Sequence, residues 1–434
     1  MVLGLCEDYP EETRSLAAAR VDLKTAQDAG ARVLRIAFGW DAIEPERGHF
    51  DWSFWDDFVR MADERSIELI PYVCYTPKWA AVDQGEDFWR SPPRDPEDFA
   101  RFMTVLVSRY KHVIHSWELW NEPDNRSYWL GTREQFAALV RAGSRAVRLA
   151  DPQATIVLGG IAGETDFLEE LFRSDRIAPA VDVVNLHSYF ETWHPDPIET
   201  LPDYVNRATE IVREHGEDEP LWMAETGYSS VGGRTLVSEV YHARYRGEHT
   251  DEAQAVALAR TFVTALATGE LPLVAWYRIN DLPATEEVIG DDNNRHLGVR
   301  TVKGSNKPAL TTFALLTRWF KQPYRNLQPV VHPSPPSDSP VEVNAFALRD
   351  GRQIIAAWLG MPDAPSSITE PVTDTRCMRF RVKLPKTRAS IVRVTDAVGK
   401  PIPAGRFTWR NTRSTVELDM EVRGGELLLC ELQP

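Results

Sequence analysis

The chain has 434 residues, of which 43% are hydrophobic and 26% are charged, as in an ordinary globular protein with room for a large domain and a smaller companion. The 49 lysines and arginines against 64 aspartates and glutamates leave a net charge of −15, and there is no local basic run. This balance argues against nucleic acid or an anionic membrane as a partner, and no stretch reaches the length of a membrane span.

The spacing of the cysteines bears on metal binding, and the opening residues bear on the location of the protein in the cell. Cys6, Cys74, Cys377 and Cys430 lack Cys-X-X-Cys or histidine spacing, so we expect no metal site, and nothing in the sequence implies an organic cofactor. The opening residues, MVLGLCEDYPEETR, contain no positively charged segment followed by an apolar one. We therefore expect a cytoplasmic protein, or a secreted one if a leader has been removed. A monomer is favoured, although the oligomeric state stays open.

From the amino terminus to about residue 320, short apolar and β-branched runs alternate with longer segments of helical periodicity. The helical segments include residues 52–66 and 96–112, and the second begins with a proline at a helix-entry position. The eight predicted strands are residues 2–7, 32–38, 67–73, 115–121, 155–160, 181–189, 220–226 and 273–279.

The order of these segments predicts an α/β fold. Strands that are nearly continuous apolar runs, each followed by a helix, are typical of a parallel sheet covered by helices. Eight such units predict a closed (β/α)8 TIM barrel over residues 1–322. An open doubly wound sheet is the alternative, but it usually has a glycine-rich loop after its first strand, whereas residues 6–13 read CEDYPEET.

Residues 323–434 differ in character, and we predict a C-terminal β-sandwich there. A Pro/Ser-rich stretch at 328–343 is followed by six short alternating runs with turn signals between them. We expect this domain to pack against the barrel rather than to bind sugar by itself, since Trp358 and Trp409 could equally lie in a core. A chain ending near residue 322 should then be insoluble or much less stable.

The carboxyl ends of the predicted strands are rich in polar and aromatic residues, and the loops after these ends form the active site of a barrel of this kind. In chain order the residues are Arg35, Trp40, Tyr75, Trp79, Asn121, Glu122, His187, Tyr189, Glu225, Thr226, Trp276 and Tyr277. Two carboxylates, Glu122 and Glu225, should therefore face each other across one mouth. The apolar strand in WELWNEPD (117–124) would be a barrel stave that holds Glu122 in place.

Paired carboxyl groups are what glycoside hydrolysis requires, because one protonates the leaving oxygen and the other attacks the sugar or activates water. We expect burial near Trp120 to raise the pKa of Glu122. Glu225 should stay ionised with help from Arg35 and a hydrogen bond from Tyr189.

Simpler explanations exist for each of these residues taken alone. A single glutamate at a strand end is more often a solvated loop residue. Glu118 is a rival carboxylate, but it lies within its strand and should fill the barrel interior with a buried partner. Arg35 could be only an interior counter-ion, and His187 a satisfied core histidine. The coincidence of all these groups at the correct strand ends favours the functional interpretation.

Two motifs together resemble clan A of the glycoside hydrolases: WELWNEPD at the fourth strand and MAETGYSS (223–230) at the seventh. Residues 35–59, RIAFGWDAIEPERGHFDWSFWDDFV, resemble the second strand and loop of that clan. Residues 296–316, HLGVRTVKGSNKPALTTFALL, resemble the run from its eighth strand into its last helix. The resemblance covers about residues 1–320, and it is greatest to family 39, which includes bacterial endoglycosidases and exo-acting β-xylosidases.

The resemblance implies a role for individual residues. Glu122 would be the acid/base and Glu225 the nucleophile, while Asn121 would hold the 2-hydroxyl of the substrate. Trp276 would floor the subsite next to the cut, and the residues at 187–189 would orient the nucleophile. One departure is that family 39 often has a β-rich segment before the barrel, whereas almost nothing precedes the first strand here.

We predict a retaining glycoside hydrolase that cuts β-linked oligosaccharide or polysaccharide by double displacement. Aromatic residues on several loops would line an extended cleft, which favours endo-action. These residues are Trp40, Tyr75, Trp79, Trp89, Tyr128, Trp129, Tyr189 and Trp193, although Trp79, Trp89 and Trp129 could merely pack their own loops.

Three alternatives stay open. An exo-acting β-glycosidase such as a β-xylosidase would have the same catalytic pair. An inverting hydrolase would have its carboxyl groups about 6.5–9.5 Å apart rather than about 5–5.5 Å. A barrel that binds carbohydrate without turning it over would belong to another class of protein.

Overall fold

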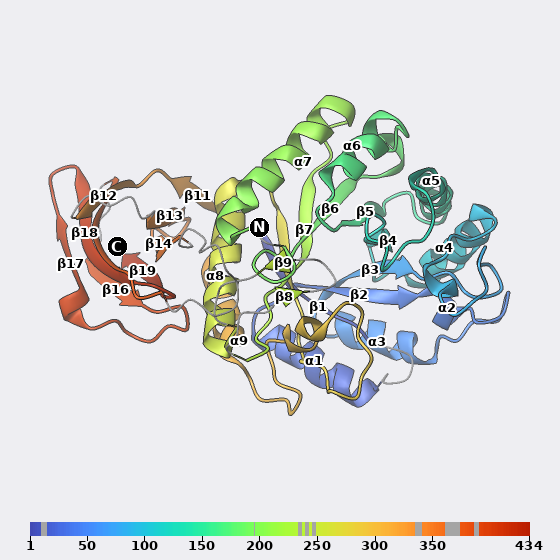
Figure 1. Cartoon of the computed structure of the whole chain (residues 1–434), viewed down its shortest axis with the longest axis horizontal. Helices are drawn as coiled ribbons and strands as arrows, with labels where there is room; N and C mark the ends of the chain where they lie inside the picture. The colour runs from blue at the N-terminus through green and yellow to red at the C-terminus, as the bar shows by residue number, and fades with distance from the viewer. Residues whose placement is uncertain are drawn as a thin grey trace.

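The protein consists of a closed eight-stranded barrel with a β-sandwich beside it (Figure 1). The computed structural model describes residues 1–9, 15–194, 196–232, 237–238, 243–244, 249–334, 341–360, 374–385 and 390–434. Part of the predicted Pro/Ser-rich stretch, residues 335–340, lies outside the described residues.

All eight predicted barrel strands are present, and each pairs in parallel with its neighbours in the order β1-β10-β7-β6-β5-β4-β3-β2, closing on β1. Their bounds are β1 (Val2–Glu7), β2 (Val33–Gly39), β3 (Glu68–Cys74), β4 (Ser116–Asn121), β5 (Thr155–Ile161), β6 (Val183–Ser188), β7 (Leu221–Thr226) and β10 (Leu273–Tyr277). Because both faces are covered, most residues of these strands are buried, and β4 and β6 are buried along their whole length. The predicted TIM barrel is confirmed. A short hairpin, β8 (Val237–Ser238) with β9 (Ala243–Arg244), follows β7.

Helices surround the barrel, and both predicted helical segments are confirmed. Helix α4 begins at Pro96, where the side chain of Asp95 accepts a hydrogen bond from the backbone of Glu97. The helices are α1 (Leu16–Asp28), α2 (Trp40–Ile43), α3 (Ser53–Asp63), α4 (Pro96–Tyr110), α5 (Arg133–Ala150), α6 (Thr165–Arg173), α7 (Leu201–His215), α8 (Asp251–Thr268) and α9 (Pro308–Phe320). Within the described part of the chain, no helix combines the length and the apolar character that crossing a membrane requires.

The C-terminal region is a sandwich of two antiparallel sheets, as predicted. One sheet has the strand order β11-β13-β14-β19-β16 and the other β12-β15-β18-β17. The strands are β11 (Tyr324–Leu327), β12 (Val330–Ser334), β13 (Val341–Leu348), β14 (Gln353–Leu359), β15 (Cys377–Pro385), β16 (Ile391–Thr395), β17 (Phe407–Asn411), β18 (Thr415–Arg423) and β19 (Leu427–Gln433).

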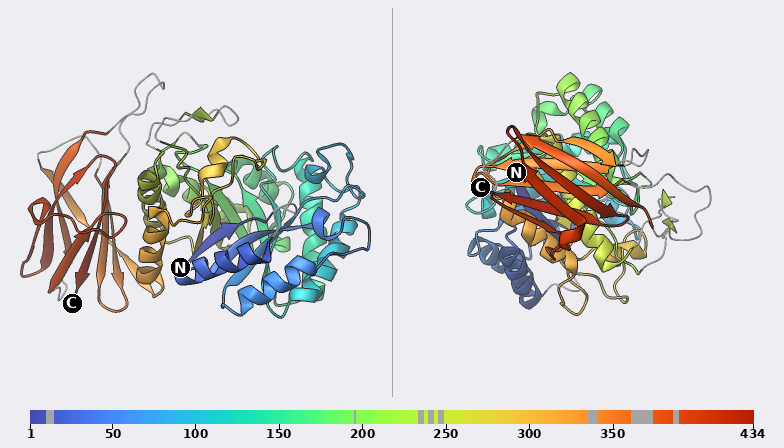
Figure 2. Two further views of the ribbon diagram at one scale, coloured as in Figure 1. Left: turned by 90° about the horizontal axis from the view of Figure 1, so that it is seen from below. Right: turned by 90° about the vertical axis from the view of Figure 1, so that its left-hand side faces the viewer.

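Helices α8 and α9 lie between the barrel and the sandwich (Figure 2). Every residue of β14 is buried, and its side chains alternate between two apolar cores. Ile355, Ala357 and Leu359 face the other sheet. Ile354 and Trp358, one residue out of phase with these, join the apolar cluster that surrounds the barrel. The sandwich therefore buries one of its own sheet faces against the helices of the barrel.

Candidate active site

The carboxyl ends of the barrel strands open into one cavity of about 530 Å³. Glu122 follows directly after β4 and has a positive φ of 44°, and Glu225 is the penultimate residue of β7. Both line the cavity, although only 6% and 7% of their surfaces are exposed. The fold thus places the two predicted carboxylates at the same mouth, largely shielded from water.

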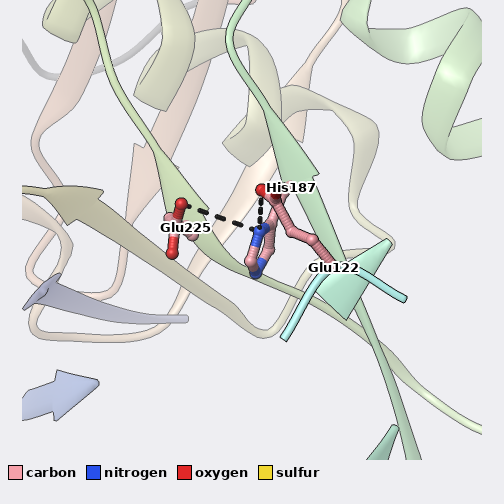
Figure 3. Close-up of side chains that lie close together, drawn as sticks. All are labelled: Glu122, His187 and Glu225. Carbon is pink, nitrogen blue, oxygen red and sulfur yellow. Dashed lines mark hydrogen bonds and ion pairs between the residues drawn. The ribbon is translucent and has the colours of Figure 1, made fainter. Parts of the chain in front are cut away.

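His187, on β6, lies between the two carboxylates (Figure 3). Its Nδ1 is 2.9 Å from Oε1 of Glu122 and 3.7 Å from Oε1 of Glu225. One carboxylate oxygen of each glutamate and a ring nitrogen of His187 all lie within 4.8 Å of one another. The three side chains therefore form one compact group.

Glu225 has a cation and a hydroxyl group as partners. Its Oε2 accepts a hydrogen bond from Nη1 of Arg35 at 2.5 Å, and its Oε1 accepts one from the hydroxyl of Tyr189 at 2.6 Å. Burial raises the pKa of Glu225 above its ordinary value, while His187, Arg35 and the bond from Tyr189 lower it. The expected contacts of Glu225 with Arg35 and Tyr189 are present. They lower its pKa against the effect of desolvation of the carboxylate, which the sequence did not indicate.

Within the described part of the chain, the hydrogen-bond partners of the Glu122 side chain are neutral. Oε2 accepts a hydrogen bond from Nδ2 of Asn125 at 2.9 Å, and Oε1 faces His187. Burial raises the pKa of Glu122 to about 7, because the bond from Asn125 and the more distant charge of Arg35 offset the desolvation only in part. The carboxyl group can therefore hold a proton near neutral pH.

The proton on His187 can be assigned from its neighbours. The backbone N–H of Ala224 donates to Oδ1 of Asn185 at 2.8 Å, so the amide nitrogen of Asn185 faces Nε2 of His187 at 3.3 Å. Nε2 then accepts, and Nδ1 carries the proton that it donates to Glu122. Burial lowers the pKa of His187 to about 4, so the imidazole is neutral near pH 7.

The position of His187 depends on a glycine of the neighbouring strand. A Cβ added at Gly160 of β5 would lie only 1.9 Å from Nε2 of His187. The same glycine accepts a hydrogen bond from the backbone of Glu122 at 3.0 Å. Gly160 therefore lets β5 approach both the imidazole and the loop that carries Glu122.

Glu118 lies inside the barrel with a buried partner, as its place within the strand predicts. It is fully buried, and its two oxygens accept hydrogen bonds from Nε and Nη2 of Arg35 at 2.7 and 2.9 Å. Arg35 also donates to Asn121 at 2.7 Å. The arginine is thus both an interior counter-ion of Glu118 and a direct partner of Glu225.

Trp276 does not line the cavity, contrary to the expectation that it would floor a subsite. It is completely buried, its indole N–H donates to the carbonyl of Leu297, and its ring contacts Phe262 of α8. Side chains alternate along a strand, so Trp276 faces the surrounding helices while Tyr277 faces the mouth and lines the cavity. The aromatic residue at this position of the site is Tyr277.

Trp40 and Trp79 also lie outside the cavity lining. Trp40 begins helix α2, is completely buried, and donates its indole N–H to Glu44 at 2.8 Å. Trp79 packs edge-on against Trp40 and donates to the carbonyl of Glu44 at 2.9 Å. Both rings therefore hold the loops after β2 and β3 together, the structural alternative that the sequence had left open for Trp79.

The other aromatic residues predicted for the cleft form two groups, one that lines the cavity and one that packs against neighbouring aromatic rings. Tyr75, Tyr128, Tyr189 and Trp193 line the cavity. Trp89 and Trp129 do not; Trp89 packs against Tyr75 and Trp129 against Trp120. Half of the eight predicted aromatic residues thus line the cavity, and the lining also contains Tyr72, Phe190, Tyr204 and Tyr277, so that most of its aromatic residues are tyrosines.

The structure adds Asp8 and Tyr72 to the predicted residues of the cavity wall. Asp8, just after β1, accepts hydrogen bonds from the hydroxyls of Tyr72 at 2.7 Å and Tyr277 at 3.2 Å. The ring of Tyr72 also lies under the guanidinium of Arg35, with 4.1 Å between the ring centroid and Cζ of the arginine. Asp8 directly follows the first strand, just as Glu225 lies at the end of the seventh. This position at a strand end is the feature of the sequence from which Asp8 could have been predicted.

Glu122, His187 and Glu225 include the ligand types that transition metals accept. A cation among them would, however, lie beside the guanidinium of Arg35, which contacts Glu225 at 2.5 Å. Repulsion between like charges opposes such a site. The four cysteines are free thiols, three of them buried and Cys377 exposed.

The chain is similar in sequence to known glycoside hydrolases. The model of the family described as Cellulase (glycosyl hydrolase family 5) matches residues 13–264. Endo-1,4-beta-xylanase C of Paenibacillus barcinonensis is 23% identical over 203 residues, which are 39% of this chain and 18% of that protein. An endo-1,4-beta-xylanase of Agaricus bisporus is 28% identical over 130 residues, covering 27% of this chain and 37% of the relative. The chain thus spans less than two fifths of the length of these curated relatives.

Solved structures share the whole fold at low sequence identity. A family 39 glycoside hydrolase from Bacteroides cellulosilyticus WH2 has a TM-score of 0.73 and 18% identity, over 99% of this chain and 80% of that one. A monomeric beta-xylosidase from Caulobacter crescentus CB15 has a TM-score of 0.64 and 19% identity, over 100% and 96%. The resemblance to clan A is confirmed: the matching family model is that of family 5, and family 39 is represented among the similar structures.

Proposed function

This chain belongs to the cellulase family, glycosyl hydrolase family 5, and is a glycoside hydrolase, and we propose that it cuts β-linked oligosaccharide or polysaccharide with retention of anomeric configuration. In this proposal Glu225 is the nucleophile and Glu122 is the acid/base.

The separation of the two carboxylates carries the proposal. Oxygens of Glu122 and Glu225 come within 4.8 Å of each other. Retaining enzymes hold their carboxyl groups about 5–5.5 Å apart, whereas inverting enzymes need about 6.5–9.5 Å so that a water molecule fits between the sugar and the base. The short separation supports direct attack on the sugar by one of the two groups.

The surroundings of the two groups support this assignment of roles. In the first step the ionised Glu225 attacks the anomeric carbon, and Glu122 gives its proton to the glycosidic oxygen as the bond to the leaving group breaks. In the second step Glu122, now ionised, takes a proton from a water molecule as the water oxygen attacks the anomeric carbon and the ester bond between the sugar and Glu225 breaks. Arg35 and Tyr189 favour the ionised form of Glu225, while burial favours the protonated form of Glu122.

We propose that the bound sugar is held by Asn121, Asp8 and Tyr277. Oδ1 of Asn121 accepts from Arg35, so its amide N–H groups are left for the 2-hydroxyl of the substrate. Asp8 lines the cavity between two tyrosine hydroxyls and can accept hydrogen bonds from further sugar hydroxyls. Tyr75, also in the lining, supplies an aromatic ring that can pack against the apolar C–H face of a sugar.

The extent of the cavity supports endo-action. Its volume of about 530 Å³ lies within the range of sites that enclose ligands larger than one sugar ring. Its wall includes Tyr72 of β3, Trp193 of the loop after β6, and Tyr204 and Arg207 of α7. A chain of several sugars could therefore contact the protein on both sides of the cut.

Two measurements test the proposal. Proton NMR during hydrolysis of an aryl β-glycoside should show the β-anomer as the first product; the α-anomer first would establish inversion. Reduced oligosaccharides of increasing length should show kcat/KM rising over several sugar units, because remote binding energy is used at the reacting centre. Release of monosaccharides alone from chain ends would establish exo-action, and binding without any product would identify a carbohydrate-binding barrel.

A further inference from the structure

The sandwich makes a buried polar contact with the segment that follows β6. Trp358 of β14 is only 1% exposed, and its indole N–H donates to Oε1 of Glu199 at 2.6 Å. Glu199 lies in a short 3-10 helix, η3 (Ile198–Thr200), at the entrance to α7. A side chain of the C-terminal domain thus donates a hydrogen bond to a carboxylate of the barrel.

Glu199 is linked in turn to Glu191 through one arginine. Arg260 of α8 donates to Glu199 from Nε at 3.0 Å and from Nη2 at 2.7 Å. Its Nη1 donates to Oε2 of Glu191 at 2.9 Å. Arg260 is 8% exposed and Glu191 is 1% exposed, so each charge depends on the other for compensation. The three charged groups should therefore move as one unit.

Glu191 fixes the loop that follows β6. It adopts a φ of 60°, which few residues other than glycine adopt, and its backbone N–H donates to the carbonyl of His194 at 3.0 Å. Its Oε1 accepts from the backbone N–H of Ile198 at 3.0 Å. The same loop carries Tyr189, which donates to Glu225 at 2.6 Å, and Trp193, which lines the cavity.

We propose that the sandwich is a positioning element of the active site. Through the chain Trp358–Glu199–Arg260–Glu191 it holds the loop after β6 so that the hydroxyl of Tyr189 stays on Glu225. The family match ends at residue 264 and so does not account for this domain. The inference rests on the proposed role of Glu225, and it gives the C-terminal domain a part in the reaction in addition to its part in stability.

The test compares two substitutions that each remove one donor between the domains. Trp358→Phe removes the indole N–H on Glu199. Tyr324→Phe is the matched control, because Tyr324 of β11 donates across the same boundary to the carbonyl of Leu266 at 3.2 Å, a group that is not one of the four linked side chains. The readouts are the thermal midpoint and the pH profile of kcat/KM on an aryl glycoside.

Both substitutions should lower the thermal midpoint, but only Trp358→Phe should change catalysis. We expect a loss of about threefold to tenfold in kcat/KM and an acidic limb displaced to higher pH, because a looser Tyr189 no longer favours the ionised Glu225. In a Tyr189→Phe background the same change should have almost no further effect on kcat/KM. Glu199→Gln keeps the side-chain volume and should act in the same direction, which provides a second variant if Trp358→Phe folds poorly.

An unchanged pH profile in Glu199→Gln and Trp358→Phe, or losses that simply add to that of Tyr189→Phe, would overturn the inference. The proposed function would survive that result provided Glu225→Gln still abolishes turnover. Absence of glycosidase activity in the unaltered protein would instead remove the function on which the inference rests.

Discussion

The ends of β4 and β7 present the same residue in two different surroundings. Glu122 and Glu225 are almost equally exposed, at 6% and 7%, and both face His187. Glu225 also contacts the guanidinium of Arg35 and the hydroxyl of Tyr189, whereas the partners of Glu122 among the described residues, Asn125 and His187, are neutral. The two carboxyl groups therefore differ in role because of the groups that contact them, and not because of a difference in burial.

The largest effect should come from removing the nucleophile. Glu225→Gln keeps the volume of the side chain but cannot form the glycosyl ester, so kcat should fall by a factor on the order of 10⁴ or more. Initial rates on an aryl glycoside, with circular dichroism as the check on folding, measure this. Wild-type turnover by a folded Glu225→Gln protein would show that Glu225 is not the nucleophile.

The effect of Glu122→Gln should depend on the leaving group. A general acid contributes roughly 10²- to 10⁴-fold, and it contributes least when the departing group needs no proton. We therefore expect a large loss on an unactivated oligosaccharide and a much smaller loss of the first step on a dinitrophenyl glycoside. Equal losses on both substrates would mean that Glu122 does not act as the acid.

The same substitution should reveal what burial of Glu122 costs the folded protein. The pKa of Glu122 is raised to about 7, so the folded state binds this proton more tightly than the unfolded state, and stability falls as pH rises from about 4.5 through 7. Glutamine cannot ionise and escapes this penalty. Relative to the parent, Glu122→Gln should therefore gain about 3 kcal/mol in free energy of unfolding between pH 4 and pH 8.

Urea unfolding at the two pH values measures this difference, and any cost of glutamine that does not depend on pH cancels. A stability difference between the two proteins that is the same at pH 4 and pH 8 would show that Glu122 is not held in its protonated form by burial.

The smallest expected effect concerns the hydroxyl on Glu225. Tyr189→Phe removes a bond that lowers the pKa of Glu225, so this pKa should rise. The acidic limb of kcat/KM should therefore move to higher pH, while the alkaline limb, which reports Glu122, should stay in place. A shift of the alkaline limb alone would reverse the assignment of the two groups.

Much of the site could be predicted because strand ends are visible in the sequence. The apolar runs located all eight strands, and the fold then brought Asn121, Glu122, His187, Tyr189 and Glu225 to one mouth. These residues share the cavity because of where their strands end.

The errors came from the direction in which single side chains point. Trp276 and Tyr277 are neighbours on β10, and strand alternation sends the tryptophan to the helices and the tyrosine to the cavity. Trp40 begins a helix rather than continuing its strand. Asp8 acquires its role only through barrel closure, since its partners Tyr72 and Tyr277 are 64 and 269 residues away along the chain.

The central claim is that Glu225, and not Glu122, forms a covalent bond to the sugar. The most direct test uses the 2-deoxy-2-fluoro derivative of the best aryl glycoside substrate, in which the fluorine slows breakdown of the intermediate more than its formation with an activated leaving group. Mass spectrometry of the intact protein should then show the addition of one fluorosugar, and peptide mapping should locate it on Glu225. A label on Glu122, or no label on a protein that hydrolyses the parent substrate with inversion, would contradict the account.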